Sequence, residues 1–242
     1  MKNVLITGSK GFVSRNLIEK LSQYNCFAIL EFDTDNDISE LEEKVIRSDI
    51  IIHLAGVNRP KNEDEFANVN TGLTKQIINI INENNLHPKI ILSSSTQALL
   101  DNPYGKSKKE AEEILIKQNK EFGTDIKIFR FPGLFGKYCR PNYNSVVATF
   151  CYNISHDIPI QISNPENVIT LVYIDDVCSA IINEMKNESK EIYPEINPKY
   201  NITLGKLVDI LTSFKNGEVD DITDDFNNKL YHTYRYYVTA QF

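Results

Sequence analysis

The chain begins with the stretch Met1-Lys2-Asn3-Val4-Leu5-Ile6-Thr7-Gly8-Ser9-Lys10-Gly11-Phe12-Val13-Ser14. Its apolar, β-branched first half predicts a buried strand at 2–7, and the amphipathic residues from Phe12 onward predict a helix. Gly8 and Gly11 lie between the two and allow a turn tight enough for backbone N–H groups to reach a pyrophosphate. A glycine turn can also exist for shape alone, but its place after the first strand favours a dinucleotide-binding fold, in which Ser14 replaces the usual third glycine.

The rest of the first half continues this alternation of short apolar strands and longer amphipathic helices. Such alternation is typical of a parallel sheet covered by helices. We therefore expect an α/β fold with a Rossmann-type doubly wound parallel sheet. The predicted strands cover 2–7, 27–32, 50–54, 89–93 and 126–131, and the predicted helices cover 12–24, 38–47, 63–84 and 103–122.

After Gly136 the pattern loosens into loops that contain proline and asparagine. We expect residues 1–131 to form the dinucleotide-binding core, and residues 132–242 to form a smaller, interleaved C-terminal lobe that binds substrate. Within that lobe, residues 168–186 again predict a strand, an acidic turn and an apolar helix. We expect this segment to return to the core.

The composition excludes several classes of protein. The chain has 242 residues, of which 41% are hydrophobic and 24% charged, as in an ordinary globular protein. Lys and Arg number 26 and Asp and Glu 33, so the net charge of −7 argues against nucleic acid or acidic membranes as partners. The longest apolar run is only strand-sized and Met1 directly precedes a strand, so we expect a cytoplasmic protein without an export leader. The 4 cysteines and 4 histidines form no ligand cluster, so we expect no metal site.

Two signals at the predicted nucleotide site point to different cofactors. Asp33 ends the second predicted strand, where an acidic side chain accepts hydrogen bonds from the adenosine ribose; it favours NAD and repels a 2′-phosphate. Lys10 in the glycine loop and Arg15 in the first helix are cations that can bind that phosphate, which favours NADP. From the residues alone the choice stays open.

A tyrosine and a lysine open the helix predicted after the fourth strand. Tyr104 and Lys108 are four residues apart and therefore lie about one turn apart on the same helix face. A neighbouring ammonium group lowers the pKa of a phenol and makes proton transfer feasible. The serine-rich end of the preceding strand can add a hydroxyl that hydrogen-bonds a substrate carbonyl. We prefer Ser95 for this role, with Ser94 or Thr96 as alternatives.

Together these motifs resemble those of the extended short-chain dehydrogenases/reductases, the superfamily of sugar-nucleotide epimerases, dehydratases and reductases. The resemblance covers nearly the whole chain and includes the segments His53-Leu54-Ala55-Gly56, Asn68-Val69, 130–136 and Tyr173-Ile174-Asp175-Asp176-Val177. It implies catalytic roles for Ser95, Tyr104 and Lys108. It also implies NAD(P) binding by Gly8, Lys10, Gly11, Phe12, Arg15, Asp33, Leu54, Ala55, Gly56, Asn68 and Lys108.

More narrowly, the chain resembles the reductases of capsular polysaccharide synthesis in the UDP-N-acetyl-L-fucosamine pathway over residues 53–60, 101–105 and 141–146. This implies NADPH-dependent reduction of the C4 keto group of a UDP-2-acetamido-2,6-dideoxy-hexos-4-ulose, with NADH possible because of Asp33. Gly133 departs from the superfamily pattern, which has asparagine there near the substrate diphosphate. The implied UDP-sugar ligands are Asn58, Arg59, Lys137, Arg140 and Asn144.

Several alternatives stay open. Those reductases continue into a metal-binding cupin epimerase domain, so this chain is either a truncated or a free-standing reductase. Asp33 also suits an epimerase or dehydratase that recycles bound NAD, although an acidic pair typical of dehydratases does not follow Ser95. A third hypothesis is a non-catalytic dinucleotide-binding scaffold. The resemblance also implies a homodimer formed through the helices at 63–84 and 103–122. We further expect an exposed interface at the C-terminal tyrosines Tyr231, Tyr234, Tyr236 and Tyr237.

Overall fold

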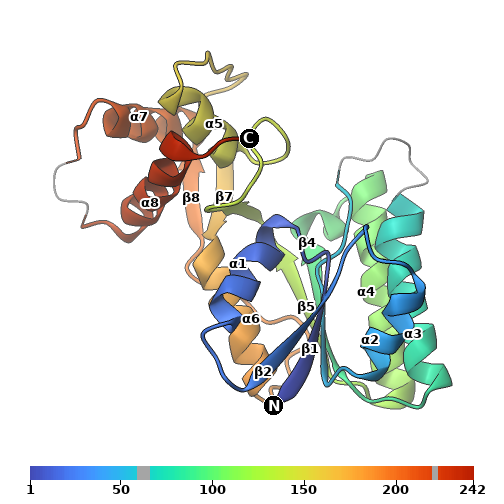
Figure 1. Ribbon diagram of the computed structural model, residues 1–242. Helices are drawn as coiled ribbons and strands as arrows, with labels where there is room; N and C mark the ends of the chain where they lie inside the picture. Colours follow the sequence, from blue (N-terminus) through green and yellow to red (C-terminus); the bar gives the residue numbers. More distant parts are fainter. Residues whose placement is uncertain (59–65, 220–222) are drawn as a thin grey trace. The chain divides into compact units, whose positions relative to one another are not determined.

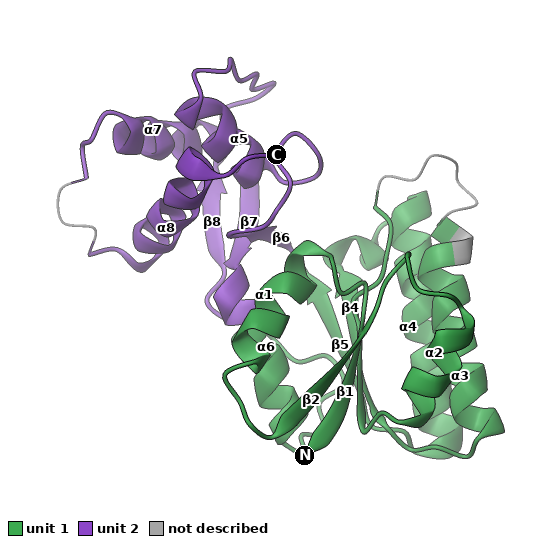
Figure 2. Ribbon diagram, in the orientation of Figure 1, with its two compact units in different colours: residues 1–131, 178–195 green, residues 132–177, 196–242 purple. Residues whose placement is uncertain are grey.

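The computed structural model describes residues 1–58, 66–219 and 223–242, apart from the side chains of residues 67 and 68. The chain forms two compact units, shown in Figure 2. Unit 1 comprises Met1–Phe131 and Cys178–Glu195, and unit 2 comprises Pro132–Val177 and Ile196–Phe242. The segment that returns to unit 1 therefore starts later and ends later than the predicted 168–186. The reason is that residues 168–173 form a strand in the sheet of unit 2.

Unit 1 contains a five-stranded parallel sheet with the order β2-β1-β3-β4-β5. Its strands are β1 (Lys2–Thr7), β2 (Phe27–Phe32), β3 (Ile50–His53), β4 (Lys89–Ser95) and β5 (Ile126–Phe131). The chain runs outward from β1 in both directions, which is the doubly wound arrangement predicted from the sequence. The carboxyl ends of the strands share one edge, and the switch of direction beside β1 is where such folds bind ligands.

Helices cover both faces of this sheet (Figure 1). On one face lie α1 (Phe12–Leu21) and the unit 1 part of α6 (Ile174–Lys186); on the other lie α2 (Ser39–Ile46), α3 (Leu73–Glu83) and α4 (Pro103–Phe122). A π-helical segment, η1 (Phe66–Gly72), precedes α3, and a short 3-10 helix, η2 (Thr96–Leu99), precedes α4. The core on the side of α2, α3 and α4 is aliphatic and includes Leu5, Leu41, Ile51, Ile77, Ile81, Leu92, Ala111 and Leu115.

The helix that carries the predicted tyrosine and lysine begins and ends at the predicted residues. Asn102 caps α4, because its side chain accepts a hydrogen bond from the N–H of Gly105 at 2.8 Å, and Pro103 occupies the first turn. Gly123 ends the helix in the left-handed conformation with φ of 70°. These signals fix where Tyr104 lies relative to the end of β4.

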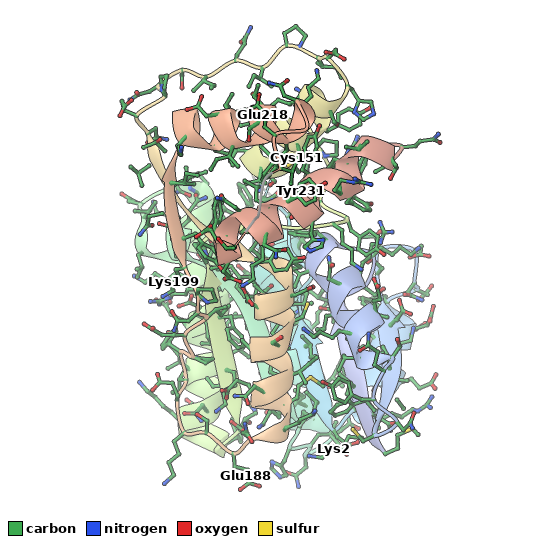
Figure 3. The ribbon with its side chains drawn as sticks, turned by 90° about the vertical axis from the view of Figure 1, so that its left-hand side faces the viewer. Lys2, Cys151, Glu188, Lys199, Glu218 and Tyr231 are labelled. Atoms are coloured by element: carbon green, nitrogen blue, oxygen red, sulfur yellow. The ribbon has the colours of Figure 1, made fainter. Side chains whose placement is uncertain are left out.

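Unit 2 contains a three-stranded sheet with the order β6-β7-β8. Strands β6 (Gly133–Phe135) and β7 (Val168–Tyr173) are parallel, whereas β7 and β8 (Tyr200–Thr203) are antiparallel. Helices α5 (Val146–Ser155), α7 (Leu204–Lys215) and α8 (Asp225–Thr239) complete the unit. Their apolar faces form a separate core, in which Cys151 is fully buried and Tyr231 packs against Phe214 with 5.2 Å between ring centroids. Cys151 and Tyr231 are labelled in Figure 3.

The expected exposed interface at the C-terminal tyrosines is wrong for two of them. Tyr234 and Tyr237 are buried in the core of unit 2. The Tyr237 hydroxyl donates to the carbonyl oxygens of Cys139 at 2.5 Å and Gly136 at 3.2 Å. These tyrosines therefore support the fold of unit 2 and hold the loop that follows β6. Among the described residues, no helix combines the length and apolar character that crossing a membrane requires.

Candidate active site

The glycine loop lies at the carboxyl end of β1. Gly8 has φ of 67°, and a β-carbon there would lie 2.7 Å from the Cα of Ala55, so no other residue fits. Gly11 caps α1 without any side-chain hydrogen bond, and the Ser14 hydroxyl donates to the Gly8 carbonyl at 2.6 Å. Phe12 and Arg15 follow in the first turn of α1. This cradle of backbone at a helix N-terminus fits a cofactor pyrophosphate.

The two residues with opposite cofactor preferences make different contacts. The Asp33 carboxylate accepts the backbone N–H of Lys10 at 2.7 Å and that of Thr34 at 2.7 Å, so it also braces the glycine loop. The Lys10 ammonium group forms an ion pair with Asp35 at 2.6 Å, with both side chains more than 60% exposed (65% and 62%). Asp35 was not predicted, because nothing in the sequence pattern distinguishes it from an ordinary turn residue.

Behind the loop, a buried histidine joins β1, β3 and α3. Nδ1 of His53 lies 2.7 Å from the Thr7 hydroxyl, and Nε2 lies 2.9 Å from the Thr74 hydroxyl. Since the Thr74 hydroxyl donates to the Asn70 carbonyl at 2.8 Å, it accepts from Nε2, which assigns the neutral tautomer. Burial, with the charge of Lys108, lowers the pKa of His53 to about 3. His53 is therefore a neutral structural group.

The segment after β3 is held by a residue that sequence reasoning missed. Asn70 accepts the N–H of Val57 at 2.8 Å and donates to its carbonyl at 3.0 Å. The same amide donates to the Ser107 hydroxyl at 2.9 Å, and this hydroxyl donates to the carbonyl of Tyr104 at 2.8 Å. Asn70 thus ties the segment 54–57 to the start of α4. Its place two residues after the predicted Asn68 is the only sequence signal for it.

Ser95 and Tyr104 meet where β4 ends and α4 begins. The Ser95 hydroxyl acts on the Tyr104 phenol, and it also caps η2 by accepting the N–H of Gln97 at 3.2 Å. Burial raises the pKa of Tyr104, and the hydrogen bond with Ser95 opposes that rise. Ser95, rather than the predicted Lys108, is therefore the neighbour that lowers the pKa of this phenol. Ser94 points elsewhere and is buried, and Thr96 is exposed within η2.

Lys108 is buried beside the same strand end. Its ammonium group donates to the carbonyl of Ser93 at 2.9 Å. Burial lowers the pKa of Lys108 to about 8, and the charge of Glu112 opposes this effect. A β-carbon on Gly56 would lie 3.1 Å from both the Lys108 Nζ and the Asn70 Oδ1, so glycine keeps this side of the ammonium group open. Lys108 and Tyr104 together present a cation and a neutral proton donor.

A second missed group is the buried carboxylate of Glu112, one turn further along α4. It accepts a hydrogen bond from the Ser94 hydroxyl and pairs with Arg130, with 2.5 Å between Nη2 and Oε2. The Tyr193 hydroxyl donates to the same carboxylate at 3.2 Å. The signal that could have found Glu112 is its four-residue spacing from Lys108 on the same helix face.

The remaining predicted residues lie in three different parts of the chain. Asn58 is exposed after β3, Arg59 lies outside the described residues, and the side chain of Asn68 is likewise not described. Lys137, Arg140 and Asn144 lie in unit 2, in and after the loop that Tyr237 holds. There the Arg140 guanidinium lies 5.6 Å from the centre of the Tyr143 ring, and the Lys137 ammonium 5.1 Å from that of Tyr138.

The substitution of glycine at position 133 has a steric reason. A β-carbon there would lie 2.9 Å from the carbonyl oxygen of Thr170 in β7 and 3.0 Å from a side-chain carbon of Leu171. The close pairing of β6 and β7 therefore excludes the expected asparagine unless the backbone shifts. The acidic residues at 175 and 176 lie in the first turn of α6, and Asp176 pairs with Lys229 at 2.9 Å. This contact favours a structural role for Asp176.

The chain is similar to several known proteins. The model of the NAD dependent epimerase/dehydratase family matches residues 4–202. The UDP-2-acetamido-2,6-beta-L-arabino-hexul-4-ose reductase of Pseudomonas aeruginosa is 41% identical over 236 residues, which cover 96% of this chain and 63% of that protein.

Among solved structures, the capsular polysaccharide assembling protein CapF from Staphylococcus aureus aligns with a TM-score of 0.88 and 39% identity, over 98% of this chain and 66% of that one. The UDP-glucuronic acid 4-epimerase from Bacillus cereus in complex with NAD aligns with a TM-score of 0.84 at 17% identity, over 97% and 98% of the two chains, which shows a shared fold. The chain spans less than two thirds of the length of the Pseudomonas relative (63%).

Proposed function

This chain belongs to the NAD dependent epimerase/dehydratase family, and on that premise we propose that it is an NAD(P)-dependent nucleotide-sugar reductase. Its substrate is a UDP-2-acetamido-2,6-dideoxy-hexos-4-ulose, whose C4 keto group it reduces in the synthesis of a capsular polysaccharide precursor. The similarity to the Pseudomonas reductase and to CapF supports this choice of reaction. The single observation that carries it is the meeting of Ser95, Tyr104 and Lys108 at the end of β4.

The residues of unit 1 have separate roles in the proposed reaction. Nicotinamide, when bound, supplies the hydride for the C4 carbon. Tyr104, kept protonated by the burial that raises its pKa, donates its phenolic proton to the C4 oxygen. Ser95 hydrogen-bonds the same oxygen and orients the phenol. Lys108 holds the cofactor ribose and adds positive charge beside the oxygen that gains electron density.

We assign NADPH as the reductant, with NADH as the alternative that Asp33 supports. The exposed ammonium group of Lys10 supports NADPH, because a 2′-phosphate can replace Asp35 as its partner. Arg15 in the first turn of α1 is a second candidate cation. The Asp33 carboxylate accepts hydrogen bonds from the N–H groups of Lys10 and Thr34. These bonds to the glycine loop are by themselves sufficient to explain an acidic residue at this position. Its presence is therefore compatible with either cofactor.

The UDP part of the substrate is assigned to cations and amides outside the Ser-Tyr-Lys set. We propose that the diphosphate is bound by Lys137 and Arg140 from the loop after β6, because guanidinium groups suit bidentate phosphate binding. Asn144 supplies a further polar contact. The sugar is assigned to Asn58 and Arg59 after β3. With glycine at position 133, the hydrogen bond that the family asparagine would give is either missing or supplied by other residues.

The proposal is tested by the loss of nicotinamide absorbance when the purified chain meets an already C3-epimerised UDP-4-keto-6-deoxy-N-acetylhexosamine. NADPH and NADH are supplied in parallel, and oxidation of NADPH is the expected result. Tyr104→Phe should lower turnover by about 100-fold or more while cofactor binding stays within about twofold, because only the proton donor is lost. Gln118→Ala, in the same helix but with its side chain bonded to Asn82 and Thr124, is the matched control.

Preference for NADH would show that Asp33, at the end of β2, determines the choice of cofactor. Cofactor binding without oxidation of either cofactor would instead favour the dinucleotide-binding scaffold. Release of a 4-epimer without net change in absorbance would favour the epimerase alternative.

A further inference from the structure

The carboxylate of Glu112 is a buried acid of unit 1 that the proposed reaction does not use. Its side chain is 2% exposed, and its oxygens accept hydrogen bonds from Ser94, from Arg130 at 3.0 Å (Nε to Oε1) and from Tyr193 at 3.2 Å. These partners come from β4, from β5 and from the segment after α6. Burying a carboxylate costs free energy unless the group is paired. This set of partners therefore indicates that the Glu112 carboxylate has a fixed position.

The partner of Glu112 in β4, Ser94, is the middle one of three serines at the end of the strand. Ser93, Ser94 and Ser95 are consecutive, and each makes a different contact with α4. The Ser93 carbonyl accepts a hydrogen bond from the ammonium group of Lys108, the Ser94 hydroxyl donates to Glu112, and the Ser95 hydroxyl acts on the Tyr104 phenol. The middle residue is thus tied to Glu112, while its two neighbours meet the two groups that α4 supplies to the reaction.

We propose that Glu112 is a positioning residue, which acts on the reaction through Ser94 and Ser95. Ser94 and Ser95 are adjacent in the backbone, so the hydrogen bond that fixes the Ser94 side chain against α4 also restrains the backbone from which the Ser95 side chain projects. Glu112 also follows Tyr104 and Lys108 on one helix face at four-residue spacing. One carboxylate therefore joins the strand end that carries the hydroxyl to the helix that carries the phenol. This inference rests on the proposed function only for its effect on rate.

Arg130 makes this arrangement possible. Its guanidinium group is bidentate to Glu112, with Nε 3.0 Å from Oε1 and Nη2 2.5 Å from Oε2, and it lies 4.4 Å from the centre of the Tyr193 ring. The guanidinium group thus places an opposite charge beside the buried carboxylate, which also accepts the hydrogen bond of the Ser94 hydroxyl. Removing Glu112 would leave Arg130 without this partner. The link between Glu112 and Ser94 is therefore better tested by substituting Ser94.

The first test is kinetic and uses Ser94→Ala, which removes the link and leaves the Glu112–Arg130 pair intact. We expect kcat to fall by about tenfold, the kinetic equivalent of one lost buried hydrogen bond, with the KM for the cofactor unchanged. In a Ser95→Ala background the same substitution should have no further effect, because a group that acts through Ser95 cannot act when Ser95 is absent. An undiminished loss in that background would overturn the proposal.

The second test needs no turnover, so it also separates failure of this inference from failure of the proposed function. Fluorine NMR of the whole chain labelled with fluorotyrosine, assigned with Tyr104→Phe, reports the surroundings of the Tyr104 phenol. We expect Ser94→Ala and Glu112→Gln each to move the Tyr104 signal toward its position in Ser95→Ala. Gln118→Ala removes buried hydrogen bonds elsewhere in α4 and should leave the signal in place.

These outcomes decide the two questions separately. If the Tyr104 signal moves but the unsubstituted chain reduces no UDP-ketosugar, the positioning role stands and the proposed reaction fails. If the chain is an active reductase and Ser94→Ala changes neither kcat nor the signal, Glu112 is only a structural acid. A shift of equal size in Gln118→Ala would have the same meaning, because it would show a general loosening of α4.

Discussion

Lys108 is a buried ammonium group whose charge depends on the pH of ordinary assays. Burial lowers its pKa to about 8, whereas the pKa of Tyr104 is raised above its usual 10.0. The groups that face Lys108 are the neutral His53, the carboxylate of Glu112 and, behind that carboxylate, Arg130. Tyr104 thus stays protonated at pH 9, and any loss of charge between pH 7 and 9 belongs to Lys108.

We therefore expect kcat/KM for the cofactor to fall on the alkaline side with an apparent pKa near 8. Lys108→Arg should remove this limb, because a guanidinium group stays charged, even though the variant binds cofactor less well. The measurement is the pH–rate profile of both proteins from pH 6 to about 9.5. An alkaline limb that persists unchanged in the arginine variant would assign the titration to another group.

His53 contributes stability that acid removes. Its pKa is 6.5 when exposed and about 3 in the folded chain, so the folded state binds fewer protons between these values. Stability from this group is therefore present above pH 6.5 and is lost as the pH falls toward 3, by at most about 5 kcal/mol at about 1.36 kcal/mol for each pH unit. Urea unfolding followed by circular dichroism at pH 7 and pH 4.5 should show a smaller loss in His53→Gln than in the unsubstituted chain.

Residue types and spacing predicted the Ser95, Tyr104 and Lys108 set, but not the groups that hold it. The Tyr-x-x-x-Lys spacing places two side chains on one helix face, which is a local property. The contacts of Asn70 with Val57 and of Glu112 with Ser94 join elements that are far apart in the sequence, so no local pattern encodes them. For the same reason, a local pattern alone does not distinguish Ser95 from its neighbours.

At the scale of elements, the start of α4 depends on a close approach to η2. A β-carbon on Gly105 would lie 2.7 Å from the carbonyl oxygen of Leu100 and still closer to that of Gln97. Replacing a helical glycine by alanine usually stabilises a helix by about 1 kcal/mol. Here we expect Gly105→Ala to destabilise the protein by about 1–3 kcal/mol, because overpacking against η2 outweighs the gain in helix propensity.

Urea unfolding of Gly105→Ala measures this effect. Gly123→Asn is the control, because Gly123 ends the same helix with φ of 70° in open surroundings, where asparagine is tolerated. Since Gly105 lies next to Tyr104, the alanine variant should also lose turnover. A stability equal to or above that of the unsubstituted chain would contradict the close approach.

Strands and helices with strong local signals were predicted with their bounds, and those set by distant partners were not. The strands at 2–7, 27–32 and 126–131 and the helix at 103–122 agree with the structure, because apolar runs, Asn102-Pro103 and Gly123 mark their ends. The strands β6 and β8 have only 3 and 4 residues, and they are stabilised by pairing with β7 rather than by their own pattern. That pairing also placed 168–173 in unit 2.

At the scale of the whole molecule, the homodimer expected through the helices at 63–84 and 103–122 stays a prediction, and the structure says what kind of contact it would be. The exposed residues of α3 and α4 are almost all polar or charged, with Pro103 and Phe122 as the exceptions at the two ends of α4. They include Lys75, Gln76, Asn79, Lys109, Glu110, Glu113, Lys117 and Glu121. Cations and carboxylates are mixed on the described parts of these faces, so a contact between two copies there would be mainly polar.

Such a dimer should weaken as salt is added, because exposed ion pairs are screened over about 10 Å at 0.1 M ionic strength. We expect sedimentation velocity at micromolar concentration to show a dimer at low ionic strength and mainly monomer at about 0.5 M salt. Lys117→Glu, on the exposed face of α4, should weaken the dimer at low salt without changing the unfolding midpoint. A monomer under all conditions would exclude the dimer, and a dimer indifferent to salt and to Lys117 would place the interface on another, apolar surface.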